Sequence, residues 1–415
     1  MRARSIDRSR LSREAALLSA AVVAVSLAAV WGFSWNAANN DFGTEAWTSL
    51  SALLHGHINV FLADAPAYGP SLLLRAPFAL PASLLGAHIE LIYRLAALPC
   101  LLALGLLGVW LAIDLRRAGG RMAAALAGVA LCAANPITYR ALQLGHPEEL
   151  LGAALCVAAV LLAQRGRINW AALALGLAVA NKEWALLAVG PVLVAAPSGR
   201  FRIVAISGAV AAALLLPIIL AMPVSATGTS GRLAVPSGPI FYPWQIFWLF
   251  ARHGDWNPHA GIYIPRGFRL PPSWLGNRAH PLIVASALPL TWAAFRRHTT
   301  RGDALLLLAL LLLVRCWLDP WDVVYYPLPF ITALAAWELS VVRRFPLAAV
   351  LATAAVVLDF WCLPPYLSQD ALAWAFIVPS TLALAVMAVR IYSLRAMRPA
   401  LAGAGGLRRA PAAPS

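Results

Sequence analysis

Long runs of apolar residues follow one another along almost the entire chain. They predict helices over residues 14–35, 91–113, 122–134, 149–163, 203–221, 281–295, 304–317, 328–341, 346–363 and 372–390. Many of these runs approach the roughly 20 apolar residues that a helix needs to cross a bilayer. We therefore expect an all-α polytopic membrane protein with about 10–12 transmembrane helices or half-helices, and with interfacial helices in its outer loops.

One stretch, residues 168–197, is compatible with two arrangements. As a single long helix it would place Asn181, Lys182 and Glu183 in the middle of the bilayer. As two half-helices, each about 20 Å long at ~1.5 Å per residue, it would bring the same residues to an outward-facing tip.

The positive charges decide between these arrangements. With the break, 22 of the 32 Lys and Arg residues fall on the side of the chain termini, whereas a continuous helix puts 16 on each side. Cytoplasmic loops of membrane proteins carry an excess of Lys and Arg. We therefore expect the break, with both termini in the cytoplasm and the protein in a bacterial plasma membrane.

The composition supports a membrane protein and excludes several other classes. The chain has 415 residues, of which 61% are hydrophobic and 12% charged, and its mean hydropathy is +0.75. This leaves no room for a soluble nucleotide-binding domain. The net charge of +15 lies in short arginine clusters between apolar runs, which is typical of membrane loops and argues against nucleic-acid partners. The five cysteines match no CxxC pattern, so we expect buried thiols.

The predicted organisation has three parts. These are a basic cytoplasmic N-terminus (residues 1–13), a single transmembrane domain (14–395) and a disordered cytoplasmic tail (396–415). Two long outer loops interrupt the domain, over about residues 36–90 and 222–280. No cleavage site of the A-x-A type follows the first apolar run, which predicts a retained span and not a signal peptide.

Acidic and histidine residues gather on the side opposite the termini. With the predicted topology, 12 of the 17 acids and seven of the eight histidines fall there. Ionisable groups at a membrane are costly and are usually kept for function. The outer side is therefore where we expect the functional site.

The first outer loop begins with a polar stretch directly after the first apolar run. Asp41 precedes a segment in which Trp47, Leu50 and Leu54 recur at helical spacing, which predicts a short interfacial helix with its apolar face in lipid. Asp41 or Thr44 could simply cap this helix. The alternative is that Asp41 is a general base at the lipid boundary, where partial desolvation makes a carboxylate a stronger base.

Residues 135–151 form a second polar cluster at the outer membrane edge. Pro147 and the two glutamates that follow it suit the start of a helix and its dipole without any function. That explanation leaves Arg140 and His146 unaccounted for, since charged groups at this depth are usually functional. We therefore treat Arg140, His146 and Glu148 as candidate substrate-binding residues.

Two further clusters lie on the same side. Lys182, the only lysine, stands at the junction of the two half-helices, where it could reach an anionic group or simply pair with a nearby acid such as Glu183. In residues 314–330, Arg315 and Asp319 interrupt apolar sequence, either as binding residues or as part of a turn anchored by interfacial aromatic residues. His55 and His57 could ligate a metal, but an H-x-H pair alone is a weak signal, and we expect no metal and no cofactor.

Together, these stretches resemble the C-type integral-membrane glycosyltransferases. An acid in the first outer loop is followed by an interfacial helix, and the sequences GHPEELL, LGLAVANKEWALLAVGPVL and RCWLDPWDVVYYPLPF are similar to the bacterial polyprenyl-phosphate-sugar-dependent group, close to glycosyltransferase family 87. The resemblance covers roughly residues 15–395.

The resemblance implies a fold, a reaction and a catalytic residue. Members of this group take mannose or a pentose from a polyprenyl-phosphate carrier, invert the anomeric centre, and use an acid of the first outer loop as catalytic base, which here is Asp41. Many members pair this acid with a second one. Here Asn40 precedes Asp41, so any pair must come from Glu45, which makes a metal-dependent version less expected.

The chemistry fits this implication independently. Nucleotide sugars are cytoplasmic, so outward-facing acids favour a lipid-linked donor, with a lipid or glycan as acceptor. The leaving phosphate needs cations more than a general acid. Lys182 and Arg315, with Arg140 or His146, are candidates to hold it, whereas Glu45, Glu148 and Asp319 are candidates to bind sugar hydroxyls. The proline-rich 222–280 loop, with its FYPWQIFWLF segment, suits a cover over such a substrate.

Other classes of membrane protein compete with this interpretation. A transporter or lipid flippase could line its path with the same outer charges, but it should also carry ionisable groups at the cytoplasmic mouth and repeat symmetry between its halves. A membrane acyltransferase or glycan ligase, and a purely structural membrane subunit, are further alternatives. The sugar, acceptor and linkage depend on small hydroxyl contacts that no motif encodes.

Overall fold

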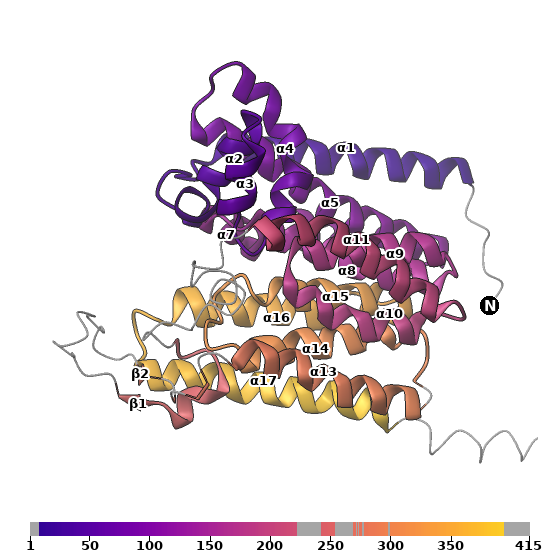
Figure 1. Ribbon diagram of the computed structural model, residues 1–415. Coiled ribbons are helices and arrows are strands. Elements are labelled where there is room, and N and C mark those ends of the chain that lie inside the picture. The colour runs from indigo at the N-terminus through magenta and orange to yellow at the C-terminus, as the bar shows by residue number, and fades with distance from the viewer. Residues whose placement is uncertain are drawn as a thin grey trace, which may run out of the picture.

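The computed structural model describes residues 8–221, 242–253, 269–270, 272, 274–275, 278–297 and 299–393. Helices dominate these residues, and the strands β1 (Arg252–His253) and β2 (Arg269–Leu270) form one short antiparallel pair (Figure 1). The chain is therefore a helical membrane protein, as its apolar pattern predicts. The N-terminal residues 1–7, most of the 222–280 loop and the predicted disordered tail lie outside the described residues.

The helices of the bundle include one for each of the ten predicted spans, most with ends within a few residues of the prediction. They are α1 (Arg8–Gly32), α5 (Ile89–Arg117), α6 (Met122–Ala133), α7 (Pro136–Leu144), α8 (Pro147–Gln164), α9 (Ile168–Asn181), α10 (Val189–Ala195), α11 (Arg200–Ala221), α13 (Ala279–Arg296), α14 (Ala304–Leu318), α15 (Leu328–Trp337), α16 (Leu347–Val357) and α17 (Gln369–Tyr392). Six stretches of the described chain are long and apolar enough to cross a membrane, and five apolar helices are shorter.

The bundle has two chemically different ends. We call the end that holds both described chain termini the terminal end; there Glu14 pairs with Arg116 at 3.1 Å, and Asp114 pairs with Arg165. We call the opposite end, which carries the connections after α1, α11 and α14, the loop end (Figure 1). All the polar clusters singled out by the sequence lie at the loop end.

The 168–197 stretch is a helical hairpin. Helix α9 ends at Asn181, Lys182 is extended, and a 3₁₀ turn, η2 (Glu183–Ala188), leads into α10. The chain reverses at this point, because a Cβ on Gly199, beyond α10, would lie 3.2 Å from Ile168 at the start of α9. The predicted break is therefore confirmed, and Lys182 lies at its tip.

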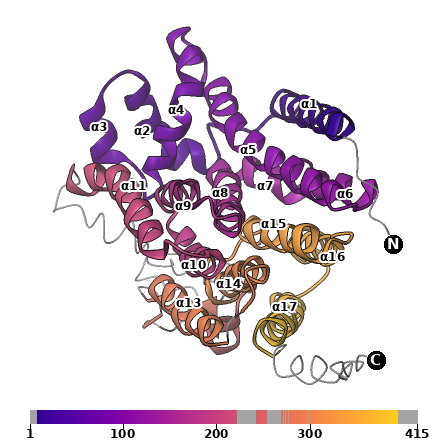
Figure 2. The same ribbon diagram turned by 90° about the vertical axis from the view of Figure 1, so that its right-hand side faces the viewer.

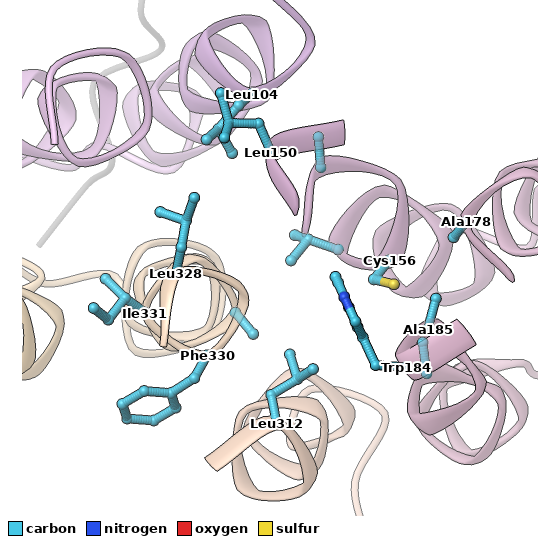
Figure 3. Close-up of a cluster of buried hydrophobic side chains, with 14 of the residues drawn as sticks. Leu104, Leu150, Cys156, Ala178, Trp184, Ala185, Leu312, Leu328, Phe330 and Ile331 are labelled. Atoms are coloured by element: carbon cyan, nitrogen blue, oxygen red, sulfur yellow. The ribbon is translucent and has the colours of Figure 1, made fainter. Parts of the chain in front are cut away.

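Helix α8 lies at the centre of the bundle, between α5, α9, α10, α14 and α15 (Figure 2). Its apolar window is 72% buried, against 22% for α1 at the periphery. In Figure 3 its residues Leu150 and Cys156 belong to one cluster of buried side chains with Leu312 of α14 and Leu328 of α15. Because lipid is as apolar as this core, close packing holds the helices together, not removal of apolar surface from water.

Small residues permit this close packing. A Cβ on Gly152 of α8 would lie 2.9 Å from the ring of Trp184 and 3.1 Å from the Asn181 amide, so the hairpin tip rests directly on the glycine. Four cysteines, Cys100, Cys132, Cys156 and Cys316, are buried thiols as predicted. The prediction is wrong for Cys362, which is exposed at the loop end.

The loop after α1 is more helical and more buried than the sequence indicates. It contains a π-turn, η1 (Phe42–Ala46), followed by α2 (Trp47–Leu54), α3 (Ile58–Asp64) and α4 (Gly69–Leu84). The helix predicted after Asp41 is present as α2, but its apolar face is not in lipid: Leu50 is fully buried and Leu54 nearly so, in the common core with α3 and α4. The apolar periodicity of α2 reflects contact with protein.

Candidate functional site

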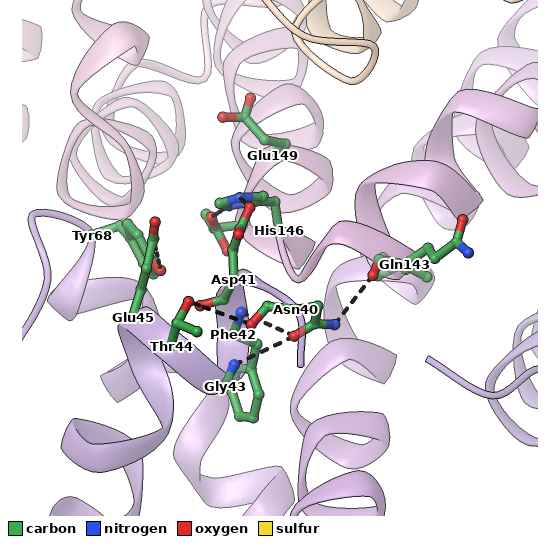
Figure 4. A network of polar contacts seen from close by, with 12 residues as sticks. Asn40, Asp41, Phe42, Gly43, Thr44, Glu45, Tyr68, Gln143, His146 and Glu149 are labelled. Atoms are coloured by element: carbon green, nitrogen blue, oxygen red, sulfur yellow. Dashed lines mark hydrogen bonds and ion pairs between the residues drawn. The ribbon is translucent and has the colours of Figure 1, made fainter. Parts of the chain in front are cut away.

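Hydrogen bonds from neighbouring residues fix the backbone around Asp41. The Glu90 carboxylate accepts bonds from the backbone N–H groups of Trp35 and Ala37, both at 2.9 Å. The Asn40 side-chain oxygen accepts from Phe42 N–H at 3.0 Å, while its amide donates to the Gln143 carbonyl (Figure 4). Asn40 therefore caps the π-turn.

Asp41 itself makes no side-chain capping bond. The interpretation of Asp41 as a helix cap is therefore wrong, and so is that of Thr44, whose hydroxyl donates to the carbonyls of Asn40 and Asp41. The Asp41 carboxylate is available for another role.

That carboxylate is bonded to a buried histidine. His146 Nε2 lies 2.9 Å from Asp41 Oδ2, and His146 Nδ1 lies 2.8 Å from Glu148 Oε1 (Figure 4). Carboxylates only accept hydrogen bonds, so both ring nitrogens donate and the ring is an imidazolium. Burial alone would lower the pKa of His146, but the bonds to Asp41 and Glu148 prevail and raise it to about 9.

From His146 a series of ion pairs continues across the bundle. Glu148 lies 3.2 Å from Lys182 Nζ and 3.7 Å from Arg75. Glu149 lies 3.7 Å from Lys182 and 3.5 Å from Arg315. We call the following set the ion-pair chain: Asp41, His146, Glu148, Lys182, Glu149 and Arg315, with Arg75 as a branch.

Most of the ion-pair chain is inaccessible to solvent. Glu148 and Glu149 are completely buried, and Arg75 and Arg315 are 1% and 4% exposed. Burying charges costs several kcal/mol per ion unless their partners and geometry are good. Since an apolar core would be at least as stable, this density of buried charge at one end of the bundle indicates a functional site.

Aromatic rings enclose the accessible end of the ion-pair chain. The Tyr68 hydroxyl donates to Glu45 at 2.7 Å, and Lys182 Nζ lies 4.4 Å from the centre of the Tyr68 ring. The Tyr325 ring lies 4.7 Å from that of His146. Asp41 stands at the opening, with 49% of its side chain exposed. One carboxylate oxygen of Asp41 is therefore bound to the imidazolium while the residue faces outward.

The sequence-predicted residues fall into two groups. Asp41, His146, Glu148, Lys182 and Arg315 come together in the ion-pair chain, and Glu45 joins its rim through Tyr68. Arg140 and Asp319 are not part of it.

The structure gives Arg140 and Asp319 other contacts. Arg140 bonds Gln143 and lies 5.8 Å from the Trp361 ring. Asp319 accepts from the backbone N–H of Trp321 and lies 3.4 Å from His280. Asp319 is thus chiefly a turn residue, as the simpler interpretation of this segment had it.

Lys182 and Arg315 are more constrained than the sequence suggested. The pairing of Lys182 with an acid is present, but its partners are Glu148 and Glu149 of α8, 34 and 33 residues away in the chain, and not Glu183. Arg315 is held between the rings of Trp184 and Tyr326, at 5.0 and 4.0 Å. Neither cation is free of a carboxylate partner.

Sequence reasoning missed two members of the ion-pair chain. Glu149 was explained by the helix dipole alone, and Arg75 was placed in an outer loop. The available signal was weak: Arg75 is an arginine within the apolar run SLLLRAPFAL, and its burial depends on how α4 packs on α5. Among the described residues, no group of three or more His, Cys, Asp or Glu side chains could hold a metal ion.

Comparison of the chain with protein-family models, with curated proteins and with solved structures finds no match. The assignment of a function therefore depends on the geometry and chemistry of the site.

Proposed function

We propose that the chain is a C-type glycosyltransferase that moves a sugar from a polyprenyl-phosphate donor to a lipid or glycan acceptor at the extracytoplasmic face of a bacterial plasma membrane. The observation that carries this proposal is the half-exposed Asp41 carboxylate, bonded to a buried imidazolium that the ion-pair chain holds in place. Mannose is the favoured sugar, and a pentose is the alternative.

In this reaction Asp41 is the general base. The acceptor hydroxyl gives its proton to Asp41 Oδ1, the oxygen that His146 does not bind, while the acceptor oxygen attacks the anomeric carbon. The bond from that carbon to the phosphate oxygen breaks, and the phosphate leaves with its electron pair, so the anomeric centre inverts. In its ion pair with His146, Asp41 is an ionised carboxylate, and this is the form that can accept a proton.

The leaving phosphate is best stabilised by preorganised cations. Lys182 is the candidate at the rim, since its side chain is 12% exposed, against 5% for Arg315 and 1% for Arg75. Lys182, Arg315 and Arg75 neutralise Glu148 and Glu149, whereas Asp41 and Glu148 keep His146 protonated. Together these cations maintain a positive site next to Asp41, and this role does not require each of them to contact the phosphate.

A transporter or flippase is the second candidate, and one observation favours it. The terminal end holds a pocket of about 400 Å³ lined in part by Asp114, Arg117, Arg165 and Arg343, the kind of charged mouth that a carrier has. Between this pocket and the ion-pair chain, however, α8 carries only apolar residues from Leu150 to Ala163, and their side chains are buried or half-buried. No polar path along α8 joins the two ends.

The donor class provides the test. Membranes containing the protein are incubated with host lipid extract and radiolabelled polyprenyl-phosphate mannose, polyprenyl-phosphate arabinose or GDP-mannose, each beside membranes lacking the protein. We expect label to become covalently attached to an acceptor from a polyprenyl-phosphate donor and not from GDP-mannose. Protein-dependent movement of intact donor across sealed vesicles without transfer would establish the flippase instead.

A further inference from the structure

An aromatic surface lies beside Asp41 and takes no part in the ion-pair chain. It is built where the residues before the 3₁₀ turn η3 (Ile246–Phe250) meet the turn after α14 and the π-turn η5 (Leu358–Cys362). The ring centroids of Tyr242 and Trp321 lie 5.7 Å apart, and those of Trp244 and Phe360 lie 4.2 Å apart and nearly parallel at 20°. Tyr242 also stacks on Trp244 at 6.2 Å. We call these four residues the aromatic wall.

Several buried polar atoms without a normal hydrogen bond lie at the aromatic wall. Asp322 is completely buried and Asp359 is 6% exposed, and neither carboxylate has a hydrogen bond of normal geometry. The indole N–H groups of Trp244 and Trp321 are likewise buried without a hydrogen bond of normal geometry, although the Trp244 indole faces the Asp359 carboxylate. Each such group costs about 1–3 kcal/mol when unpaired, and the large majority of buried polar groups in proteins are paired. Four of them together therefore point to a polar partner.

The chemistry of these groups identifies that partner. The two acids can accept hydrogen bonds, the two indoles can donate them, and the partly exposed rings of Tyr242, Trp244 and Trp321 offer apolar surface. A monosaccharide matches all three features, because its hydroxyls both donate and accept while its C–H face packs on aromatic rings. Asp322 and Asp359 offer no positive charge to an anion, and ordered water alone would leave the four rings unexplained. A π-turn such as η5 is frequent at functional sites and here places Asp359 next to the wall.

The aromatic wall adjoins the proposed catalytic base. The rings of Tyr242 and Trp321 lie 5.7 Å apart, and burial together with the charge of the Asp41 carboxylate raises the pKa of the Tyr242 hydroxyl. Tyr325, four residues after Trp321, contacts the His146 ring. A sugar packed on the wall would therefore lie close to the pair formed by His146 and Asp41.

We propose that the aromatic wall, with Asp322 and Asp359, forms a subsite that binds the ring of a monosaccharide beside Asp41. Asp322 and Asp359 accept bonds from its hydroxyls, and Trp244 and Trp321 donate to its oxygens. The role of the bound sugar in a transfer reaction rests on the proposed function. The binding of the sugar does not depend on that function, and the test measures binding alone.

The test uses the full chain, purified and reconstituted in lipid nanodiscs. Octyl α-D-mannopyranoside and octyl α-D-arabinofuranoside are titrated while saturation-transfer NMR follows their ring protons, and octyl phosphocholine controls for binding of the alkyl chain. The variants are Asp359→Asn, Asp322→Asn and Trp244→Leu. The matched controls are Asp64→Asn, an exposed acid of the first loop, and Trp317→Phe, whose indole donates to Thr381 on the face toward α17.

We expect saturable binding of at least one octyl glycoside to the wild type. It should weaken about tenfold or more in Asp359→Asn and Trp244→Leu and stay within about threefold in both controls. Asp322→Asn provides a second carboxylate variant if Asp359→Asn is not monodisperse. Equal binding by all variants, or no saturable binding of either glycoside to the wild type, would overturn the subsite while leaving the transfer reaction to its own assay.

Discussion

At the residue scale, the organising feature of the site is a histidine between two carboxylates. The sequence could place Asp41, His146 and Glu148 at one membrane edge, because each borders an apolar run. It could not reveal that one ring nitrogen of His146 bonds Asp41 and the other bonds Glu148, since Asp41 is 105 residues from His146 in the chain. Which acid faces outward and which is buried depends on the packing of η1 against α8.

The protonated state of His146 has a consequence for stability. Its pKa is about 9 in the folded protein against an ordinary value of 6.5, so its contribution is complete below pH 6.5 and is lost as pH rises through 9. The shift corresponds to about 3 kcal/mol. We expect the thermal midpoint of the purified protein to fall between pH 6.5 and 10 and to fall less steeply in His146→Asn. Parallel pH profiles for the two proteins would show that the imidazolium is not the titrating group.

Arg75 provides a second test at this scale. Arg75→Met removes a buried partner of Glu148 and should cost about 3–5 kcal/mol, because it leaves part of a buried charge uncompensated. Arg117→Met removes an arginine whose side chain is 63% exposed and whose pair with Asp114 lies at the surface, so it should change stability by less than about 1 kcal/mol. Thermal stability in detergent compares the two. A loss in Arg75→Met as small as that expected for Arg117→Met would mean that the pair between Arg75 and Glu148 is dispensable.

At the scale of elements, the hairpin of α9 and α10 determines where Lys182 lies. The charge count predicted the break correctly, because a continuous helix would have erased the asymmetry of positive charge. The interfacial helix was predicted in the right place but on the wrong surface, because the same periodicity arises whether an apolar face meets lipid or protein. The partners of α2, which are α3 and α4, are not readable from its own sequence.

Gly152 tests the contact between the hairpin and α8. Gly152→Ala would place a methyl group 2.9 Å from Trp184, so it should lower the thermal midpoint and loosen the Lys182 pairs. Gly208→Ala in α11 is the matched control, since a Cβ there meets nothing within 4 Å and alanine favours a helix over glycine by about 1 kcal/mol. Size-exclusion chromatography after heating measures both variants. An unchanged midpoint in Gly152→Ala would show that the hairpin is free to shift.

At the scale of the whole molecule, the two ends differ as the sequence predicted: arginine clusters lie at the terminal end and acids at the loop end. The apolar pattern was sufficient to predict this difference. Successive spans run in opposite directions, so their boundaries determine which connecting loops lie on the same side. The ion-pair chain was beyond its reach, because it joins α4, α8, α14 and the hairpin tip, and contacts between helices leave no periodic signal. The orientation in the membrane remains a prediction from the positive charges.

Cysteine labelling tests that orientation. Cys362 is the exposed cysteine at the loop end, so a membrane-impermeant maleimide should label it in intact cells. In a Cys362→Ser background, Ser198→Cys at the terminal end should react only after the cells are permeabilised, since Ser198 is exposed beside α10. The reverse pattern would place Asp41 in the cytoplasm and remove the argument for a lipid-linked donor.

The most direct test of the central claim is the rate of sugar transfer by Asp41→Asn. Purified wild type, Asp41→Asn and Asp64→Asn are compared in proteoliposomes with polyprenyl-phosphate mannose, or arabinose if that is the active donor, after equal folding has been shown. Loss of a general base should slow transfer by about 10²- to 10⁴-fold in Asp41→Asn, with Asp64→Asn close to the wild type. Transfer by Asp41→Asn at the wild-type rate would contradict the account, because Asp41 would then be a structural partner of His146 and not the base.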